Sequence, residues 1–231
     1  MIAHCLFEQS GHFKHAFQRA GVEARDYDIQ NGYGETDVVI DIFAEIRKAY
    51  EGEPSIFDTM TPDDILIAFF PCIYFCEASE ARFRVEFVGR VGTRAGMYRG
   101  ILERNKKRAE FLGLFIQLIA VADMRGLRLI VENPYSGSGY LARTKPLMPP
   151  AMIDTDRTQH GDFFKKPTAF WCVNFRPGAF QKIPTPRHLV RRVWDAKGSG
   201  TTGICSAERS MISEVYADNF VRNVVLRGRP E

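Results

Sequence analysis

The feature that most constrains the fold is a short apolar run that ends in a proline and a cysteine. Residues Ile65 to Phe70 are all apolar, and such a run predicts a strand buried on both faces of a parallel sheet. Pro71 ends the strand, because proline has no N–H for the sheet ladder. Cys72 is then delivered to the carboxyl end of the strand, where open α/β sheets form their ligand crevice. The cysteine is either a nucleophile or a thiol buried as packing.

Predicted strands and helices alternate on both sides of this run. We expect strands at residues 2–7, 22–29, 37–40 and 127–131, and helices at residues 13–20, 43–50, 103–124 and 208–226. The first strand, a turn with Gly11 and the first helix are typical of the opening unit of a nucleotide-binding sheet. We therefore expect an α/β fold, a Rossmann-like sheet with helices on both faces.

The distribution of prolines predicts how the chain is divided. Residues 1–135 are expected to form the core that holds the cofactor and catalytic residues. Residues 136–205 contain seven prolines between Pro146 and Pro186 and predict a short, irregular, basic insertion. Thr168 to Phe175 within it has strand propensity. Residues 206–231 are expected to form a helix that packs back on the core.

Positive charge is concentrated in one segment, although the net charge of +3 is too small to identify a partner. Residues 82–108 hold nine arginines and lysines, including Arg94, against two glutamates, and glycines interrupt them. This composition predicts a mobile basic loop. Such a loop could contact a phosphate backbone or could simply be solvated surface.

The cysteines and the N-terminus indicate a cytoplasmic protein with no membrane partner. Five cysteines at irregular spacing do not predict paired disulfides, which favours a reducing compartment. Cys72 and Cys76 lack a second Cys/His pair at zinc-ligand spacing, so we expect no metal. The N-terminus has no basic flank before an apolar core, unlike a signal peptide. The longest apolar stretch, residues 111–122, is too short to span a bilayer.

Two carboxylates stand at the ends of predicted strands. Asp28 ends the second strand, where an acid can accept the ribose hydroxyls of an adenosine cofactor; it could equally be a solvated strand end. Glu132 follows the strand at residues 127–131 and could donate a proton to a ring nitrogen. It could instead cap a following helix.

In this order, the motifs resemble those of the cytosine-C5 DNA methyltransferase family. That family opens with Asp-Leu-Phe-x-Gly-x-Gly, which is similar to Cys5-Leu-Phe-Glu-Gln-Ser-Gly11. Its catalytic segment, Asp-Leu-Leu-x-Gly-Gly-Pro-Pro-Cys, is similar to Asp64-Ile-Leu-Ile-Ala-Phe-Phe-Pro-Cys72. Its Glu-Asn-Val is similar to Glu132-Asn-Pro134. The resemblance covers residues 3–134 and, loosely, the last helix, and it implies that residues 136–205 are a reduced target-recognition segment.

The resemblance implies S-adenosylmethionine as cofactor and DNA as partner. In the family, the cysteine adds to cytosine C6 and the glutamate protonates N3, so that C5 takes the methyl group. The target base must leave the duplex to reach such a pocket. Arg143 and Arg157 are candidates for the arginine that holds the base. The remaining candidates are cofactor contacts at Phe7, Gly11, Asp28, Asp41 and Pro71, and substrate contacts at Asn133 and Arg94.

The sequence also departs from the family pattern. Gln9 replaces the first glycine of the cofactor turn, Ala68-Phe69 replace a glycine pair, and Ile73 replaces a glutamine. Two alternatives therefore stay open. The chain could be an enzyme of this fold that acts on RNA or on a free or modified nucleotide, or a non-catalytic nucleic-acid-binding module that has lost cofactor binding. Compact chains of this kind occur among phage and mobile-element proteins, so the resemblance implies such an origin for this chain.

Overall fold

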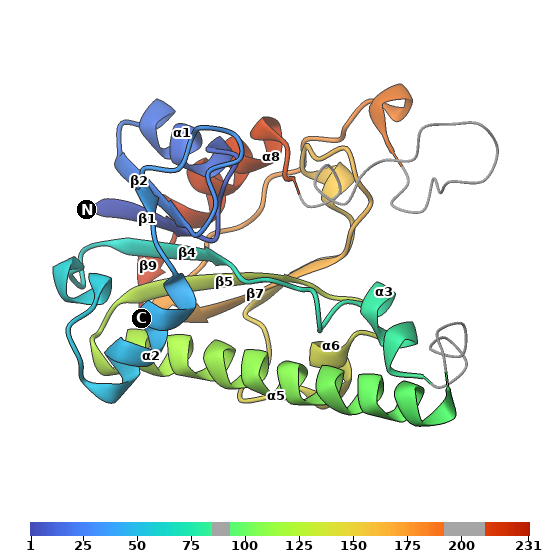
Figure 1. Ribbon diagram of the computed structural model, residues 1–231. Coiled ribbons are helices and arrows are strands. Elements are labelled where there is room, and N and C mark those ends of the chain that lie inside the picture. The colour runs from blue at the N-terminus through green and yellow to red at the C-terminus, as the bar shows by residue number, and fades with distance from the viewer. Residues whose placement is uncertain (85–92, 192–210) are drawn as a thin grey trace.

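A seven-stranded sheet lies at the centre of the protein (Figure 1). The computed structural model describes residues 1–84, 93–191 and 211–231. The strand order is β3-β2-β1-β4-β5-β7-β6, and only the pairs made by β7 are antiparallel. The predicted α/β class with a mostly parallel sheet is confirmed. The strands are β1 (Ile2–Leu6), β2 (Glu23–Asp28), β3 (Val38–Val39), β4 (Ile65–Phe69), β5 (Arg128–Pro134), β6 (Met152–Asp154) and β7 (Thr168–Val173), with a separate pair β8 (Phe175–Arg176) and β9 (Arg229–Pro230).

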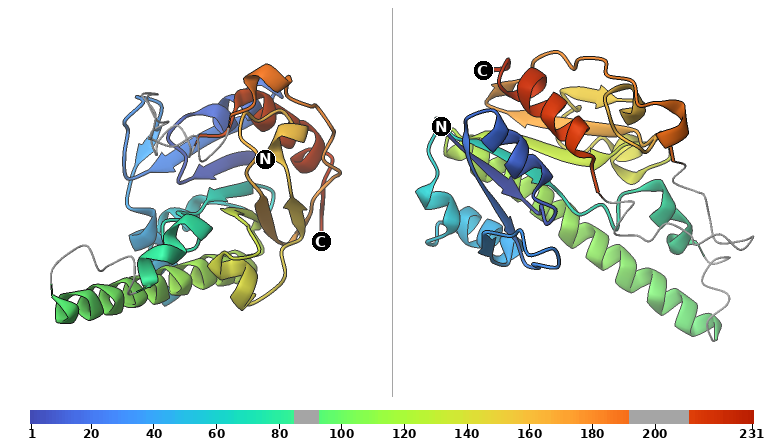
Figure 2. Two further views of the ribbon diagram at one scale, coloured as in Figure 1. Left: turned by 90° about the vertical axis from the view of Figure 1, so that its right-hand side faces the viewer. Right: turned by 90° about the horizontal axis from the view of Figure 1, so that it is seen from above.

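Helices cover both faces of the sheet, and two views at right angles show the three layers (Figure 2). On one face lie α1 (His12–Arg19) and α8 (Glu214–Asn219), which continues into a π-helical segment, Phe220–Val225. The other face carries α2 (Ile42–Glu51) and the long α5 (Arg94–Met124). The shorter helices are α3 (Glu77–Glu80), α6 (Tyr140–Thr144) and the 3-10 turns Ile56–Thr59, Ala81–Phe83, Arg157–Gln159 and Arg187–Leu189.

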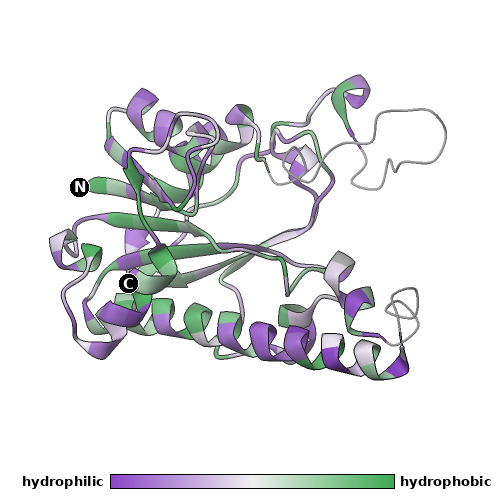
Figure 3. Cartoon of the chain, in the orientation of Figure 1, coloured by the Kyte–Doolittle hydropathy of each residue, from purple (hydrophilic) through white to green (hydrophobic). Residues whose placement is uncertain are grey.

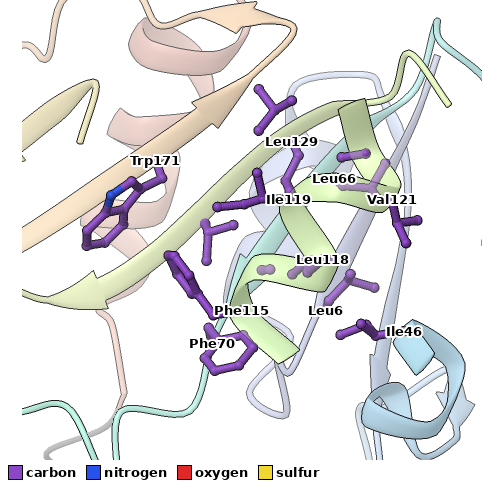
Figure 4. Packing of buried hydrophobic residues seen from close by; sticks show 14 of the residues in the cluster. Leu6, Ile46, Leu66, Phe70, Phe115, Leu118, Ile119, Val121, Leu129 and Trp171 are labelled. Atoms are coloured by element: carbon purple, nitrogen blue, oxygen red, sulfur yellow. The ribbon is translucent and has the colours of Figure 1, made fainter. Parts of the chain in front are cut away.

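The central strand β4 is buried on both faces, as its apolar run predicts. Leu66 and Ala68 pack with α2 and α5, and Figure 4 shows Leu66 among the side chains of that cluster. Ile65 and Ile67 belong to the cluster under α1 and α8, because successive side chains of a strand point to opposite faces. Each buried Leu or Ile contributes roughly 1.5–3 kcal/mol relative to an exposed one. Colouring by hydropathy shows β4 mainly in the hydrophobic colour, whereas polar and apolar residues alternate along α5 (Figure 3).

The predicted basic loop is wrong over its second half. Helix α5 begins at Arg94 and not at Glu103, so the arginines of that half lie on a helix. The hydroxyl of Thr93 caps this helix by accepting the N–H of Gly96 at 3.3 Å. A glycine in a helix costs about 1 kcal/mol, which the cap and the long continuous helix offset. Residues 85–92, also part of that prediction, lie outside the described residues.

The region predicted to be irregular supplies two strands of the central sheet. Strand β7 confirms the strand propensity of Thr168 to Phe175, and β6 pairs with it. The last helix begins at Glu214, later than predicted, because the hydroxyl of Ser213 accepts the N–H of Tyr216 at 3.1 Å and caps it; residues 208–210 lie outside the described range. Within the described ranges, no helix is both long enough and apolar enough to cross a membrane.

Candidate active site

A pocket lies at the point where the strand order of the sheet reverses. Strand β1 has β2 on one side and β4 on the other, and open α/β sheets bind ligands beyond the carboxyl ends of the strands at such a point. The pocket has a volume of about 370 Å³, within the usual range for a small-molecule site. Its β1 side is lined by Phe7, Glu8, Gln9, Ser10, Phe13, Gln30 and Tyr33, its β4–β5 side by Phe69, Phe70, Pro71, Cys72, Glu132, Pro134 and Lys166, and its rim by Met211 and Ile212.

The turn after β4 holds Cys72 in the pocket wall. The buried Asn133 donates from Nδ2 to the carbonyl of Phe70 at 2.8 Å, which fixes the end of β4 just before Pro71. The carbonyl of Cys72 accepts the N–H of Cys76 at 3.1 Å, so one helical turn brings the second thiol back beside the first. Asn133 itself does not line the pocket. Its observed role is to brace the strand that carries the candidate nucleophile.

The two thiols ionise as a pair. A hydrogen bond with Cys76, followed by burial, raises the pKa of Cys72. The same bond, helped by donors from Ser79, lowers the pKa of Cys76 to about 6. The hydrogen bond thus favours the proton on Cys72 and the negative charge on Cys76. The charge of Lys166 lowers the pKa of both thiols.

Glu132 faces the same pocket from the next strand. It pairs in register with Phe69 of β4, so strand spacing places its Cα roughly 4.8 Å from that of Phe69. The carboxyl group is buried, and this burial raises its pKa, against the attraction of Lys166 and Arg157. Its Oε1 has no hydrogen-bond partner within the described residues. A carboxyl group with a raised pKa and a free oxygen suits proton donation to a ligand.

The turn after β1 shapes the other side of the pocket. Phe7 adopts a φ of 59°, a left-handed conformation that residues other than glycine rarely adopt. Its ring packs on Phe70 at 5.6 Å between centroids. Gly11 has a φ of 71°, and a Cβ there would lie 3.0 Å from a carboxylate oxygen of Glu35, so the turn needs glycine. The predicted contact Phe7 therefore lines the pocket, and Gly11 shapes the turn without lining it.

Two predicted cofactor contacts have other partners. Asp28 accepts the N–H of Gln30 at 2.8 Å and a hydrogen bond from the side chain of Gln9. It therefore lies behind Gln9 and does not line the pocket. Asp41 caps α2 by accepting the N–H groups of Phe43 and Ala44, and it also lies outside the pocket lining. The ribose contact predicted for Asp28 stays a prediction.

None of the three candidate arginines lines the pocket. Arg94 is exposed at the start of α5. Arg143 forms an ion pair with Glu80. Arg157 is fully buried, pairs with Asp162, and lies 5.1 Å above the ring of Tyr216. Arg157 comes nearest to the predicted role, because its charge lowers the pKa of Glu132, against the effect of burial.

Sequence reasoning missed two charged residues of the pocket, Lys166 and Glu8. Among the described residues that line it, Lys166 is the one cation. It reaches the site because β7 pairs with β5 and carries the preceding residues to the pocket. A lysine just before a predicted strand was the available signal. Glu8 lies in the turn between Phe7 and Gly11, at a position that the motif Asp-Leu-Phe-x-Gly-x-Gly leaves variable.

Comparison with known proteins adds no family. No protein-family model matches the chain, and no curated protein matches it. A function for the chain therefore has to be inferred from the chemistry of the pocket.

Proposed function

We propose that the protein is an S-adenosylmethionine-dependent methyltransferase that acts on cytosine C5 in DNA through a covalent adduct with Cys72. One observation carries this proposal: the thiol of Cys72 and the buried carboxyl group of Glu132 face one pocket from the ends of two adjacent parallel strands. The first five strands follow the Rossmann-like order with the pocket at its switch point. These features agree with the order of motifs in the sequence.

The residues of the β1 side fit the proposed cofactor. The pocket is large enough for an adenosine ligand, and Phe7 and Tyr33 offer aromatic surface to a base. Gln30 offers an amide, and Glu8 has one carboxylate oxygen with no partner within the described residues. When bound there, S-adenosylmethionine would supply a methyl group on a positively charged sulfur. The methyl group would have to face the β4–β5 side.

The residues of the β4–β5 side can perform the rest of the reaction. Cys72 passes its thiol proton to the hydrogen-bonded Cys76 and adds to C6 of the base, where its electron pair forms the sulfur–carbon bond. The C5–C6 double-bond electrons shift through C4 to N3, which takes the proton of Glu132. C5 would then take the methyl group, and the sulfur of the cofactor would leave as a neutral thioether. A water molecule takes the C5 proton, Cys72 departs with the electrons of the sulfur–carbon bond and recovers its proton from Cys76, and Glu132 recovers its proton from N3.

The choice of DNA rests on the resemblance and on exposed basic residues of α5. Arg94, Arg99, Lys106 and Lys107 are exposed along that helix, and such residues contact phosphates without regard to sequence. A second candidate is an enzyme of the same fold that acts on RNA or a free nucleotide. It is favoured by the positions of Arg94, Arg143 and Arg157, because none of them lines the pocket where a flipped cytosine would be held.

Transfer of tritiated methyl groups tests both candidates. Purified protein is incubated with labelled S-adenosylmethionine and DNA, RNA or free nucleotides. We expect label in DNA, and a loss of at least about 1,000-fold for Cys72→Ala. The matched control is Cys172→Ala, which removes a thiol on β7 outside the pocket. Label in RNA or nucleotides alone would select the second candidate. Absence of both S-adenosylmethionine binding and transfer to any acceptor would favour the non-catalytic module.

A further inference from the structure

Glu8 is a buried carboxylate that the proposed reaction does not use. The residue is 6% exposed and lines the β1 side of the pocket. Its Oε1 accepts a hydrogen bond from the hydroxyl of Ser10 at 2.5 Å and from the N–H of His12 at 3.2 Å. Its Oε2 is buried and has no hydrogen-bond partner within the described residues. The group is thus held by one oxygen and leaves the other without a protein donor.

The charged groups around this turn are already paired elsewhere. The ammonium group of Lys14 lies 3.2 Å from Asp26 and 3.3 Å from Asp37. The ring of His12 hydrogen-bonds to the carbonyl of Ile212 at 2.6 Å. None of the ion pairs among the described residues includes Glu8. Burial, with a contribution from the Asp26 carboxylate, also raises the pKa of Glu8.

A carboxylate in this position is unfavourable without a ligand. Removing a charged group from water costs several kcal/mol unless a partner offsets it. Ser10 and His12 nevertheless keep the carboxylate oriented at the pocket wall, because both donors belong to the turn that starts α1. A positively charged or strongly donating ligand group would satisfy the free oxygen.

We infer that Glu8 binds a positively charged group of the adenosine-type cofactor and selects charged cofactors over neutral analogues. The inference rests on the proposed function, since it assumes that this side of the pocket holds the cofactor. Two groups of the methionine part carry the required charge, the sulfonium and the α-ammonium. Both offer the same chemistry to a carboxylate, so the ligands of the test distinguish them.

Calorimetric titration of the full chain tests the inference without a methyl acceptor. The ligands are S-adenosylmethionine with both charged groups, S-adenosylhomocysteine with the ammonium alone, and 5′-methylthioadenosine with neither. We expect Glu8→Gln to weaken S-adenosylmethionine binding by about tenfold to a hundredfold, the range for a hydrogen bond to a charged group. 5′-Methylthioadenosine should bind the variant and the wild type equally. Weakening of S-adenosylmethionine alone identifies the sulfonium, and equal weakening with S-adenosylhomocysteine identifies the ammonium.

Two further variants make the result specific. Glu35→Gln removes a carboxylate near the same turn that pairs with His15 and lies outside the pocket lining, so it should leave all three affinities unchanged. Ser10→Ala removes the donor that orients Glu8 and should weaken the charged ligands several-fold. It also serves as the test if Glu8→Gln fails to fold, which thermal unfolding without ligand would reveal.

The possible failures are distinguishable. If Glu8→Gln binds S-adenosylmethionine as tightly as the wild type, or loses 5′-methylthioadenosine by the same factor, the inference is overturned and the proposed cofactor stands. If the wild type binds none of the three ligands, the proposed function is overturned together with the inference.

Discussion

On the β4–β5 side the pocket holds the carboxyl group of Glu132 and the thiol of Cys72 beside a lysine, whereas on the β1 side it holds a carboxyl group without a cation among the described lining residues. On the first side the protein itself supplies a cation to the acidic groups. The second side leaves a charge for a ligand to balance. Catalytic groups that gain or lose charge during a reaction benefit from a fixed partner of opposite charge. A binding site gains selectivity when its own charge has no partner in the protein and the ligand supplies one. Under the proposed function, the difference separates a reacting side from a recognising side.

The sharpest test of this separation is Glu132→Gln. We expect methyl transfer to fall by about 10²–10⁴-fold, the usual contribution of a general acid, with S-adenosylmethionine affinity unchanged. Because burial raises the pKa of Glu132, the wild-type rate should decline as pH rises through that raised value, and the variant should lack this alkaline decline. Rates across a pH series and calorimetry measure the two quantities. A parallel loss of cofactor affinity would erase the distinction between the two sides.

Lys166→Met should slow the chemistry of the thiols. Loss of the cation raises the pKa of Cys72 and Cys76, because Lys166 lowers both in the wild type. A rise of one pKa unit would reduce the thiolate at neutral pH, and hence alkylation by iodoacetamide, by about tenfold at Cys72 and by about twofold at Cys76, whose pKa is about 6. Mass spectrometry of the modified peptides measures the rate at each cysteine. Lys165→Met is the matched control, since the side chain of Lys165 is 70% exposed and pairs with Asp156. Equal rates in both variants would remove Lys166 from the reacting side.

Asn133→Ala should act on stability and only through it on the pocket. The change leaves the carbonyl of Phe70 without its donor in a buried setting, which costs about 1–3 kcal/mol. Urea denaturation measures the free energy of unfolding. Methyl transfer by the folded variant should fall moderately, because Pro71 and Cys72 follow the carbonyl that is released. A stable variant with abolished transfer would instead give Asn133 the substrate contact predicted from the sequence.

Arg143→Ala should have the smallest effect. Its guanidinium is 52% exposed and pairs with Glu80 outside the pocket lining. An exposed ion pair of this kind contributes about 1 kcal/mol or less. Methyl transfer should remain within twofold of the wild type, as measured in the same tritium assay. A large loss of transfer would show that Arg143 reaches the base in the complex and would extend the reacting side to α6.

The sequence predicted the parts of the site that follow strands with a local signature. Cys72 follows a continuous apolar run and Glu132 follows a run that is apolar except for Arg128, so both strands can be recognised without information from distant segments. Lys166 could not be predicted, because its place depends on the pairing of β7 with β5, a contact between distant segments. The start of α5 was missed for a local reason: Gly96 and Gly100 indicate a loop, yet a cap at Thr93 and the following turns sustain the helix. The burial of Arg157 with Asp162 could not be predicted either, because nothing in the surrounding proline-rich sequence indicates it.

The antiparallel strand β7 has a consequence for synthesis of the chain. During synthesis, Cys72 and Glu132 would emerge from the ribosome before the segment that carries Lys166. Helix α8 would emerge last and cover the apolar face beside α1. Until β7 docks, β5 presents an open edge of unpaired N–H and C=O groups, which invites pairing with other chains. Completion of the pocket and protection of that edge are therefore the same late event. A chain truncated before residue 168 should accumulate as aggregate rather than as a weak enzyme.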